Sequence, residues 1–171
     1  MNLVIQTGEV TGAVNSYCAL SEIRQFAKDH GESLALHDDE LTPLVIRAFE
    51  YLEKKDPEFQ GCRINLCSAF PRHGVMIYGR YFDDSGIPDA LKWAQSQAVI
   101  VQSNGSQLLQ DREATEFVVE DQIGPIRTKY ANPLDVGIDN KFDTIDAFLQ
   151  PLTKRYGKFN SGVKPLVGVR Q

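Results

Sequence analysis

The chain has 171 residues, of which 42% are hydrophobic, and its formal net charge is −5 at pH 7. This length and composition fit one ordinary globular domain with a sizeable core. They exclude a membrane-spanning chain, since no apolar run is long enough to cross a bilayer, and the N-terminus lacks the pattern of a signal peptide. Three cysteines without a secretory signal indicate reduced thiols rather than disulfides.

Charge is unevenly distributed along the sequence. Residues 154–171 contain five basic and no acidic residues, which leaves −10 for residues 1–153 (−5 minus +5). An acidic body argues against general affinity for nucleic acid, because neutralising phosphates requires Lys and Arg. The basic tail suits docking on an acidic partner or on the body of a neighbouring copy, and the alternative is a solvated, disordered end.

Apolar periodicity predicts two helices in the first third of the chain. One covers residues 20–30. The other is the clearest helix in the sequence, because apolar residues follow Leu41 at i+3, i+4, i+7, i+8 and i+11. We expect Asp38 or Asp39 to cap this second helix, and Pro43 to be tolerated because it lies in the first turn.

The helical period disappears between Gly61 and Gly86, which predicts a long irregular loop with one or two short strands. A loop of this length in a compact domain is typically functional or forms an interface. It leads into a helix over residues 88–102, with Pro88 as the first helical residue and Asp89 in the first turn. On its residues alone we interpret this helix as a core helix.

Residues 116–130 have the alternation of a β-hairpin. A tight turn centred on Ile123-Gly124 places Glu120 opposite Arg127, a favourable cross-strand pair. An isolated hairpin is marginally stable in water, so we expect it to pack on its own helices or on a neighbouring subunit.

A last helix covers about residues 142–150, and an extended basic segment with spaced apolar residues follows it. The predicted fold is therefore mainly α with a β-hairpin (α+β): a small bundle of about four helices with a protruding hairpin and an extended C-terminal arm. We expect a helical domain over residues 1–153, which includes the hairpin at 116–130, and a separate arm over residues 154–171.

No catalytic or cofactor motif is present. The chain lacks a nucleophile elbow and a phosphate-binding glycine loop, so we expect no enzyme activity and no cofactor. Cys62, Cys67 and His73 could supply three metal ligands, but their spacing matches no standard zinc module. We interpret the cysteines as small buried hydrophobic residues and Asp83-Asp84 as a turn and cap, and we expect no metal.

One loop in the acidic body mixes aromatic and basic residues, as surfaces that bind single-stranded nucleic acid do. The alternative is that its aromatic side chains cover the core or a subunit interface while its arginines pair with acids, and the acidic composition of the body favours that alternative. The residues of this loop are Phe70, Arg72, His73, Tyr78, Arg80, Tyr81 and Phe82.

Six short motifs occur in order: Asn15-Ser16-Tyr17, residues 46–52, residues 69–74, Ile87-Pro88, residues 123–126 with Tyr130, and residues 147–152. Together they resemble a family from tailed bacteriophages whose members are often labelled DnaT-like single-stranded-DNA-binding proteins. In genome context, these look like the head–tail connector, or adaptor, proteins beneath the portal. The likeness covers the chain up to about residue 153, and Phe70 replaces the usual Trp of the third motif.

The resemblance implies a structural virion protein. Its subunits would form a homo-oligomeric ring, a dodecamer, that links the portal protein to a tail or neck completion protein and surrounds the passing genomic DNA without binding it specifically. It would be located in the virion neck and, before assembly, in the host cytoplasm. Within the arm we expect the interface residues to be Lys158, Phe159, Lys164, Leu166, Val169 and Arg170.

The alternative function is that of a replication accessory protein that binds single-stranded DNA, as the DnaT-like label suggests. In this alternative, Arg72, Arg80 and Tyr81 form the binding surface. Changing them to Ala would weaken DNA affinity and reduce its salt dependence.

Overall fold

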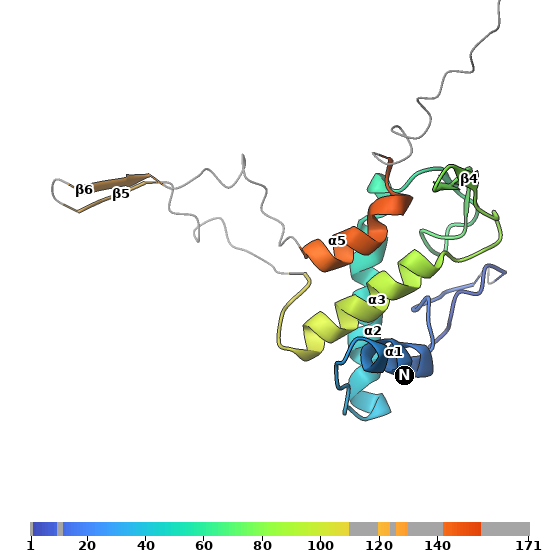
Figure 1. Ribbon diagram of the computed structural model, residues 1–171, viewed down its shortest axis with the longest axis horizontal. Helices are drawn as coiled ribbons and strands as arrows, with labels where there is room; N and C mark the ends of the chain where they lie inside the picture. Colours follow the sequence, from blue (N-terminus) through green and yellow to red (C-terminus); the bar gives the residue numbers. More distant parts are fainter. Residues whose placement is uncertain (1, 10–11, 110–119, 124–125, 130–141, 155–171) are drawn as a thin grey trace, which may run out of the picture. The chain divides into compact units, whose positions relative to one another are not determined.

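A computed structural model describes residues 2–9, 12–109, 120–123, 126–129 and 142–154 (Figure 1). The chain divides into two compact units, Met1–Leu108 with Asp143–Gln171, and Leu109–Phe142. The predicted fold class is confirmed, because the described residues form four α-helices and small antiparallel hairpins. The predicted arm at 154–171 lies almost wholly outside the described residues and stays a prediction.

Helix α1 (Leu20–Asp29) and helix α2 (Asp38–Lys54) form where the apolar periodicity predicts them. Gly31 follows α1 with φ of +75°, a left-handed conformation that commonly ends helices. The predicted cap of α2 is wrong. The residue before the helix is His37, and its backbone N–H donates to the carboxylate of Glu40 at 3.2 Å, so a glutamate one turn later satisfies this group.

The prediction that Pro43 lies in the first turn of this helix is also wrong. It is the sixth residue of α2, beyond the first turn. Proline has no N–H to donate to the carbonyl of Asp39 four residues earlier, which removes one helix hydrogen bond. Pro43 is exposed, so water can reach that carbonyl, and the helix continues through the proline.

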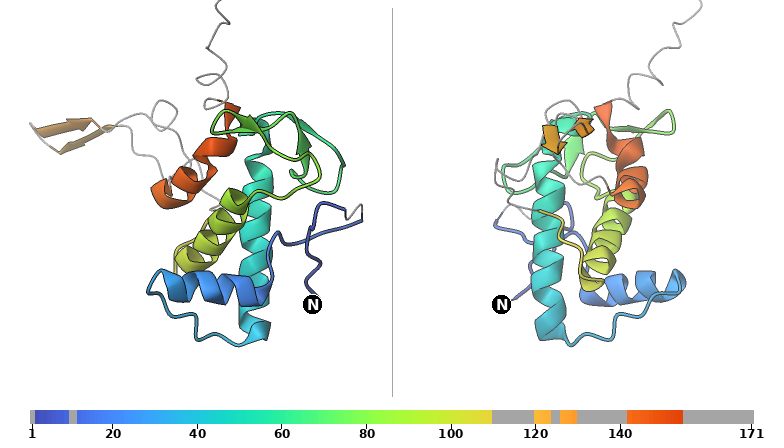
Figure 2. Two further views of the ribbon diagram at one scale, coloured as in Figure 1. Left: turned by 45° about the vertical axis from the view of Figure 1, so that its right-hand side comes forward. Right: turned by 90° about the vertical axis from the view of Figure 1, so that its left-hand side faces the viewer.

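Helix α3 (Asp89–Ser103) is the helix around which the main unit packs, since it contacts α1, α2 and α5 (Figure 2). It begins one residue later than predicted, with Pro88 as the residue before its first turn. Its buried face includes Leu91, Ala94 and Ala98, which are fully buried. The small alanines on this face let neighbouring helices approach closely, and the interpretation as a core helix is confirmed.

Helix α5 (Asp143–Leu149) runs into the short 3₁₀ helix η3 (Gln150–Leu152). The ring centroids of Trp93 in α3 and Phe148 in α5 lie 6.1 Å apart in an edge-to-face arrangement. The Nζ of Lys55 contacts the Oδ1 of Asp146 at 2.7 Å and so connects the end of α2 to α5. The predicted last helix is therefore confirmed and packs on α3.

The segment between α2 and α3 contains more strand than predicted. After the 3₁₀ helix η1 (Asp56–Glu58), strand β1 (Cys62–Arg63) pairs with β2 (Arg72–His73), and β3 (Met76–Ile77) pairs with β4 (Arg80–Tyr81). These are two antiparallel hairpins of two-residue strands. Such short strands carry almost no alternation, so a periodicity argument cannot resolve them.

The predicted hairpin forms in the second unit, with strand β5 (Glu120–Ile123) and strand β6 (Ile126–Lys129), but the predicted register is wrong. Glu120 pairs with Lys129 instead of Arg127, and Ile123 pairs with Ile126. The predicted turn would have placed Pro125 in the hydrogen-bonded ladder, where it has no N–H to donate. In the observed register the described ladder ends at the pair of Ile123 and Ile126.

No helix among the described residues is long and apolar enough to span a membrane.

Candidate nucleic-acid interface

The β3–β4 hairpin ends in a two-residue turn made by Tyr78 and Gly79. Both residues have positive φ, 51° and 79°. Two consecutive residues of positive φ are what a type I′ turn requires, and this turn matches the twist of a hairpin. Asn and Gly are the usual occupants, whereas a bulky side chain in this region costs about 1 kcal/mol. A tyrosine is therefore kept at the tip against the conformational preference of its backbone.

The hairpin presents large aromatic side chains to solvent. Tyr78 is 75% exposed and Tyr81 is 79% exposed. Between them, Arg80 is exposed and makes no ion pair within the described part of the chain. Because successive residues of a strand point to opposite faces, Arg80 and Tyr81 extend from opposite sides of the narrow ribbon. A flexible chain that passes around the tip could meet an aromatic ring on one side and a guanidinium on the other.

The side-chain amide of Gln60 fixes the hairpin to the body. Its Oε1 accepts from the backbone N of Met76 at 3.2 Å, and its Nε2 donates to the carbonyl of Met76 at 3.0 Å. The same Nε2 donates to the carbonyl of Pro151 at 2.6 Å. Gln60 is buried, and it pairs with Met76 as a neighbouring strand would. The hairpin is therefore fixed at Met76 by hydrogen bonds, while its tip at Tyr78 and Gly79 is exposed.

Two of the predicted interface residues belong to the core instead. Phe70 is fully buried, and its ring packs edge-to-face on Phe59 with centroids 5.3 Å apart. Arg72 is also buried; its guanidinium donates to the carbonyls of Gln60 at 2.7 Å and Gly61 at 3.0 Å. The alternative function's assignment of Arg72 to the binding surface is therefore wrong, whereas Arg80 and Tyr81 are accessible.

The carboxylate of Asp56 compensates the positive charge of the buried Arg72. Asp56 accepts from Arg72 and from Arg63, whose Nε lies 2.9 Å from Oδ1. Burial alone would raise the pKa of Asp56, but these hydrogen bonds outweigh it and hold that pKa below its ordinary value. The expectation that arginines of this loop pair with acids is thus correct for Arg72 but not, among the described residues, for Arg80.

His73 and Asp84 lie at the base of the hairpin. The Nδ1 of His73 contacts Oδ2 of Asp84, and the backbone N of Gly74 donates to Oδ1 at 3.3 Å. The hydrogen bond from His73 is the main cause that lowers the pKa of Asp84. Asp83 accepts from the backbone N of Ser85 at 3.2 Å. The predicted turn at these two aspartates is therefore confirmed, whereas the predicted cap is wrong, because the residue before α3 is Pro88 and no side chain caps that helix.

A buried network beneath the β1–β2 loop connects it to α2. The Oε1 of Glu53 accepts from the hydroxyl of Tyr17 and from the backbone N of Ala69, the latter at 2.9 Å. The Tyr17 hydroxyl in turn accepts from the backbone N of Phe70 at 3.3 Å. Burial raises the pKa of Glu53 and raises that of Tyr17 well above its ordinary value. This network holds the loop in place from below.

The same loop exposes aliphatic side chains that sequence reasoning missed. Leu66 is 94% exposed and Ile64 is 52% exposed. In the sequence, Ile64 and Leu66 alternate with Arg63 and Asn65, a pattern that is typical of a half-buried strand. The chain instead leaves the ladder after Arg63, so the pattern gives no signal of exposure.

The cysteines behave differently from one another. Cys18 is buried, and burial raises the pKa of its thiol to about 12, as expected for an inert core residue. Cys62 is exposed, so its predicted burial is wrong, and Cys67 is half-buried. Cys62 lies opposite His73 in the β1–β2 ladder. Among the described residues, no group of three or more Cys, His, Asp or Glu side chains could hold a metal ion.

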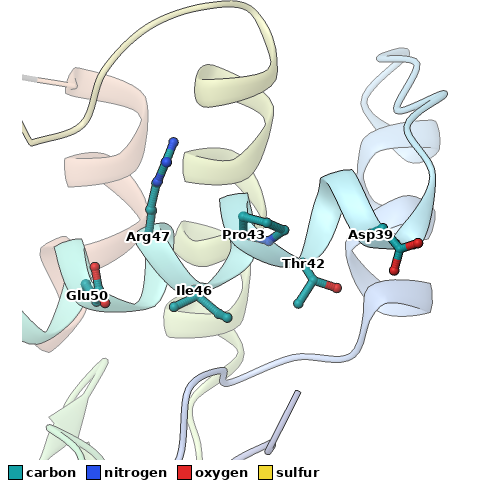
Figure 3. A pocket seen from close by; sticks show the side chains of 6 residues that line it. All are labelled: Asp39, Thr42, Pro43, Ile46, Arg47 and Glu50. Carbon is teal, nitrogen blue, oxygen red and sulfur yellow. The ribbon is translucent and has the colours of Figure 1, made fainter. Parts of the chain in front are cut away.

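A shallow hollow of about 330 Å³ lies along the exposed face of α2 (Figure 3). A single helix supplies all of its lining, so it is a space between neighbouring side chains rather than a cleft between elements. Its charged residues are of both signs, and it gathers no catalytic set. The lining residues are Asp39, Thr42, Pro43, Ile46, Arg47 and Glu50.

The family model described as "Putative DnaT-like ssDNA binding protein" matches residues 1–165. The chain belongs to this family. No curated protein and no solved structure matches it. The family match extends beyond residue 153, where the resemblance read from the sequence ended, and so includes most of the basic segment.

The match overturns the connector interpretation. The matched family is one of DnaT-like single-stranded-DNA-binding proteins and not one of phage head–tail connectors. The structural role in the virion, the dodecameric ring, and the portal and neck partners are therefore wrong, and the alternative function agrees with the match. The arm residues from Lys158 to Arg170 lie outside the described residues, so their role as an interface stays a prediction.

Proposed function

We propose that the protein binds single-stranded DNA without catalysis, and that the tip of the β3–β4 hairpin is a contact surface. The observation that carries this proposal is the pair of exposed rings, Tyr78 and Tyr81, on either side of Arg80. Every base has a π face, and stacking on an aromatic side chain contributes roughly 1–3 kcal/mol per base. The family match supports the same ligand class.

The charge of the protein indicates what kind of binding to expect. Residues 1–153 carry a net −10 and repel phosphates as a whole, so counterion release on this body is small. Stacking does not depend on net charge. We therefore expect stacking to supply most of the affinity at the hairpin, with Arg80 contributing one phosphate contact.

Fluorescence anisotropy with a labelled single-stranded oligonucleotide, at low and at physiological salt, tests the proposal. Tyr78→Ala and Tyr81→Ala should each weaken binding by about 5- to 150-fold, the equivalent of one lost stacking contact. Arg80→Ala should weaken binding and reduce the slope of log K against log salt by about 0.7.

The matched control is Arg47→Ala on α2. Arg47 is also exposed and makes no ion pair within the described part of the chain, so a general charge effect would act equally at both arginines. We expect Arg47→Ala to bind as the unmodified protein does. Equal losses for the two arginine variants, or unchanged binding by both tyrosine variants, would overturn the assignment of the hairpin. No binding at low salt would overturn the proposed function.

Duplex DNA of the same sequence provides a second comparison. Its bases are stacked within the helix and cannot lie on Tyr78 or Tyr81 without being flipped out. We expect duplex DNA to compete poorly for the labelled single strand. Equal competition would indicate binding through the phosphate backbone alone.

A further inference from the structure

A pocket of about 380 Å³ opens between α1 and α3, which lie against one another (Figure 2). Both helices supply its lining, which distinguishes it from the hollow on α2. Trp93 and Phe26 both line it, and Trp93 is 48% exposed. Trp93 is the large hydrophobic residue that α3 exposes, so its indole is a candidate contact for another apolar group.

The rim of the pocket is acidic. Glu22, Asp29 and Asp89 surround it, and Lys92 is its one basic residue. The Nζ of Lys92 lies 3.9 Å from Oε1 of Glu22, whereas Asp29 accepts from the neutral amide of Gln25 at 2.6 Å. Three carboxylates against one ammonium leave a net charge of −2. The pocket therefore favours a ligand that combines an apolar group with positive charge, since a cation beside Trp also gains from the ring quadrupole.

The C-terminal segment has this chemistry. Residues 155–171 contain four basic and no acidic residues, and apolar residues stand beside the basic ones, as in Lys158-Phe159 and Val169-Arg170. The segment follows Lys154, whose Nζ donates to the carbonyl of Pro57 at 2.8 Å. Its 17 residues can span up to about 56 Å when extended. That exceeds the width of roughly 40 Å expected for a domain of this size.

We propose that the α1–α3 pocket is the docking site of the chain's own C-terminal segment. Phe159 packs on Trp93, and neighbouring basic residues of the segment face Asp29 and Asp89. Docking and DNA binding are separate properties. If the proposed function holds, docking would also keep the positive charges of the segment away from DNA.

Trp93 is the only tryptophan of the chain, so its fluorescence reports on this pocket directly. The experiment measures acrylamide quenching and the emission maximum of the full-length protein, without DNA. Phe159→Ala, and a triple change of Lys158, Lys164 and Arg170 to Glu, should each raise the quenching constant severalfold and shift the emission to the red. High salt should produce the same change in the unmodified protein, because it screens the charge contacts.

Reversing the charge of an aspartate that lines the pocket is a second test, and it has a matched control. Asp89→Lys should release the segment, whereas Asp39→Lys changes an exposed aspartate in the first turn of another helix and should not. Quenching that is unchanged in Phe159→Ala and in the triple variant would overturn the proposal. Protection of Trp93 that disappears on dilution would also overturn it, because the segment would then come from a second copy.

Discussion

The Nη1 of Arg72 lies 2.5 Å from the Oδ1 of Asp56, and only 6% of the arginine side chain is exposed. The remaining donors of Arg72 reach backbone carbonyls, including that of Ala69 at 3.1 Å. This arginine therefore cross-links η1 to the loop that precedes the hairpin. Arg80, the other arginine of the mixed aromatic and basic loop, makes no ion pair in the described part of the chain. Its guanidinium therefore stays available to a ligand.

Asp56→Asn should destabilise the fold by about 3 kcal/mol. The substitution removes the charge that compensates Arg72, and a buried charge left without its partner is strongly unfavourable. Urea unfolding at neutral pH measures the change. Asp39→Asn, at an exposed position, should stay within about 0.5 kcal/mol of the unmodified protein. Equal stability of the two variants would mean that Asp56 does not hold Arg72.

Glu53 should make stability depend on pH in an unusual direction for a carboxylate. Burial, despite hydrogen bonds from Ala69 and Tyr17, raises the pKa of Glu53 above its ordinary value of 4.5. The folded state then binds this proton more tightly than the unfolded state. Its contribution to the free energy of unfolding is complete below 4.5 and is lost as the pH rises through the folded pKa.

Glu53→Gln isolates that contribution, because glutamine keeps an acceptor oxygen but does not titrate. The free energy of unfolding of the unmodified protein, minus that of Glu53→Gln, should increase as the pH falls towards 4.5. Urea unfolding across this range measures it. A difference that is independent of pH would show that Glu53 has an ordinary pKa.

Gln95 should be essential to the core although it is polar. Its Oε1 accepts from the backbone N of Tyr17 at 2.8 Å, and its Nε2 donates to the carbonyl of Val45 at 3.1 Å. Gln95→Met keeps the volume but leaves the buried backbone N–H of Tyr17 unpaired and removes the additional bond to the carbonyl of Val45, at a cost of about 2 kcal/mol. Gln97→Met, the same change on a half-buried position of the same helix, should cost less than about 1 kcal/mol. Thermal unfolding that ranks the two variants in the opposite order would contradict this account.

Tyr78→Asn should separate stability from binding. Asparagine adopts positive φ more readily than tyrosine, and Asn-Gly is the preferred sequence of a type I′ turn. We expect the free energy of unfolding to stay the same or rise by about 0.5–1 kcal/mol. Affinity for single-stranded DNA should fall as much as in Tyr78→Ala. Unchanged affinity would show that the ring at the tip does not contact the ligand.

The helices could be predicted because each buries an apolar stripe. The spacing of residues such as Leu41, Val45 and Ala48 in the sequence indicates that stripe. The two small hairpins could not. One of them, β3–β4, is fixed by the side chain of Gln60, which pairs with the backbone of Met76. A bond between a side chain and a distant backbone group leaves no periodic trace in the sequence.

The candidate interface was visible in part. The mixture of aromatic and basic residues marked the loop that carries the exposed hairpin, but composition could not tell Arg72 from Arg80, because burial and the position of Asp56 decide between them. The acidic body also led the sequence interpretation away from DNA. Net charge is a poor guide when two exposed rings, Tyr78 and Tyr81, can bind bases by stacking.

Trp93 and Phe148 meet directly, although 54 positions of the chain separate the two residues and the whole 109–142 unit lies between them. Helices α3 and α5 thus close the core of the main unit by their own contact. The intervening unit is an insertion that can change in length and sequence while this packing is kept. Natural variation could therefore remodel residues 109–142 as an exchangeable module and leave the β3–β4 hairpin untouched.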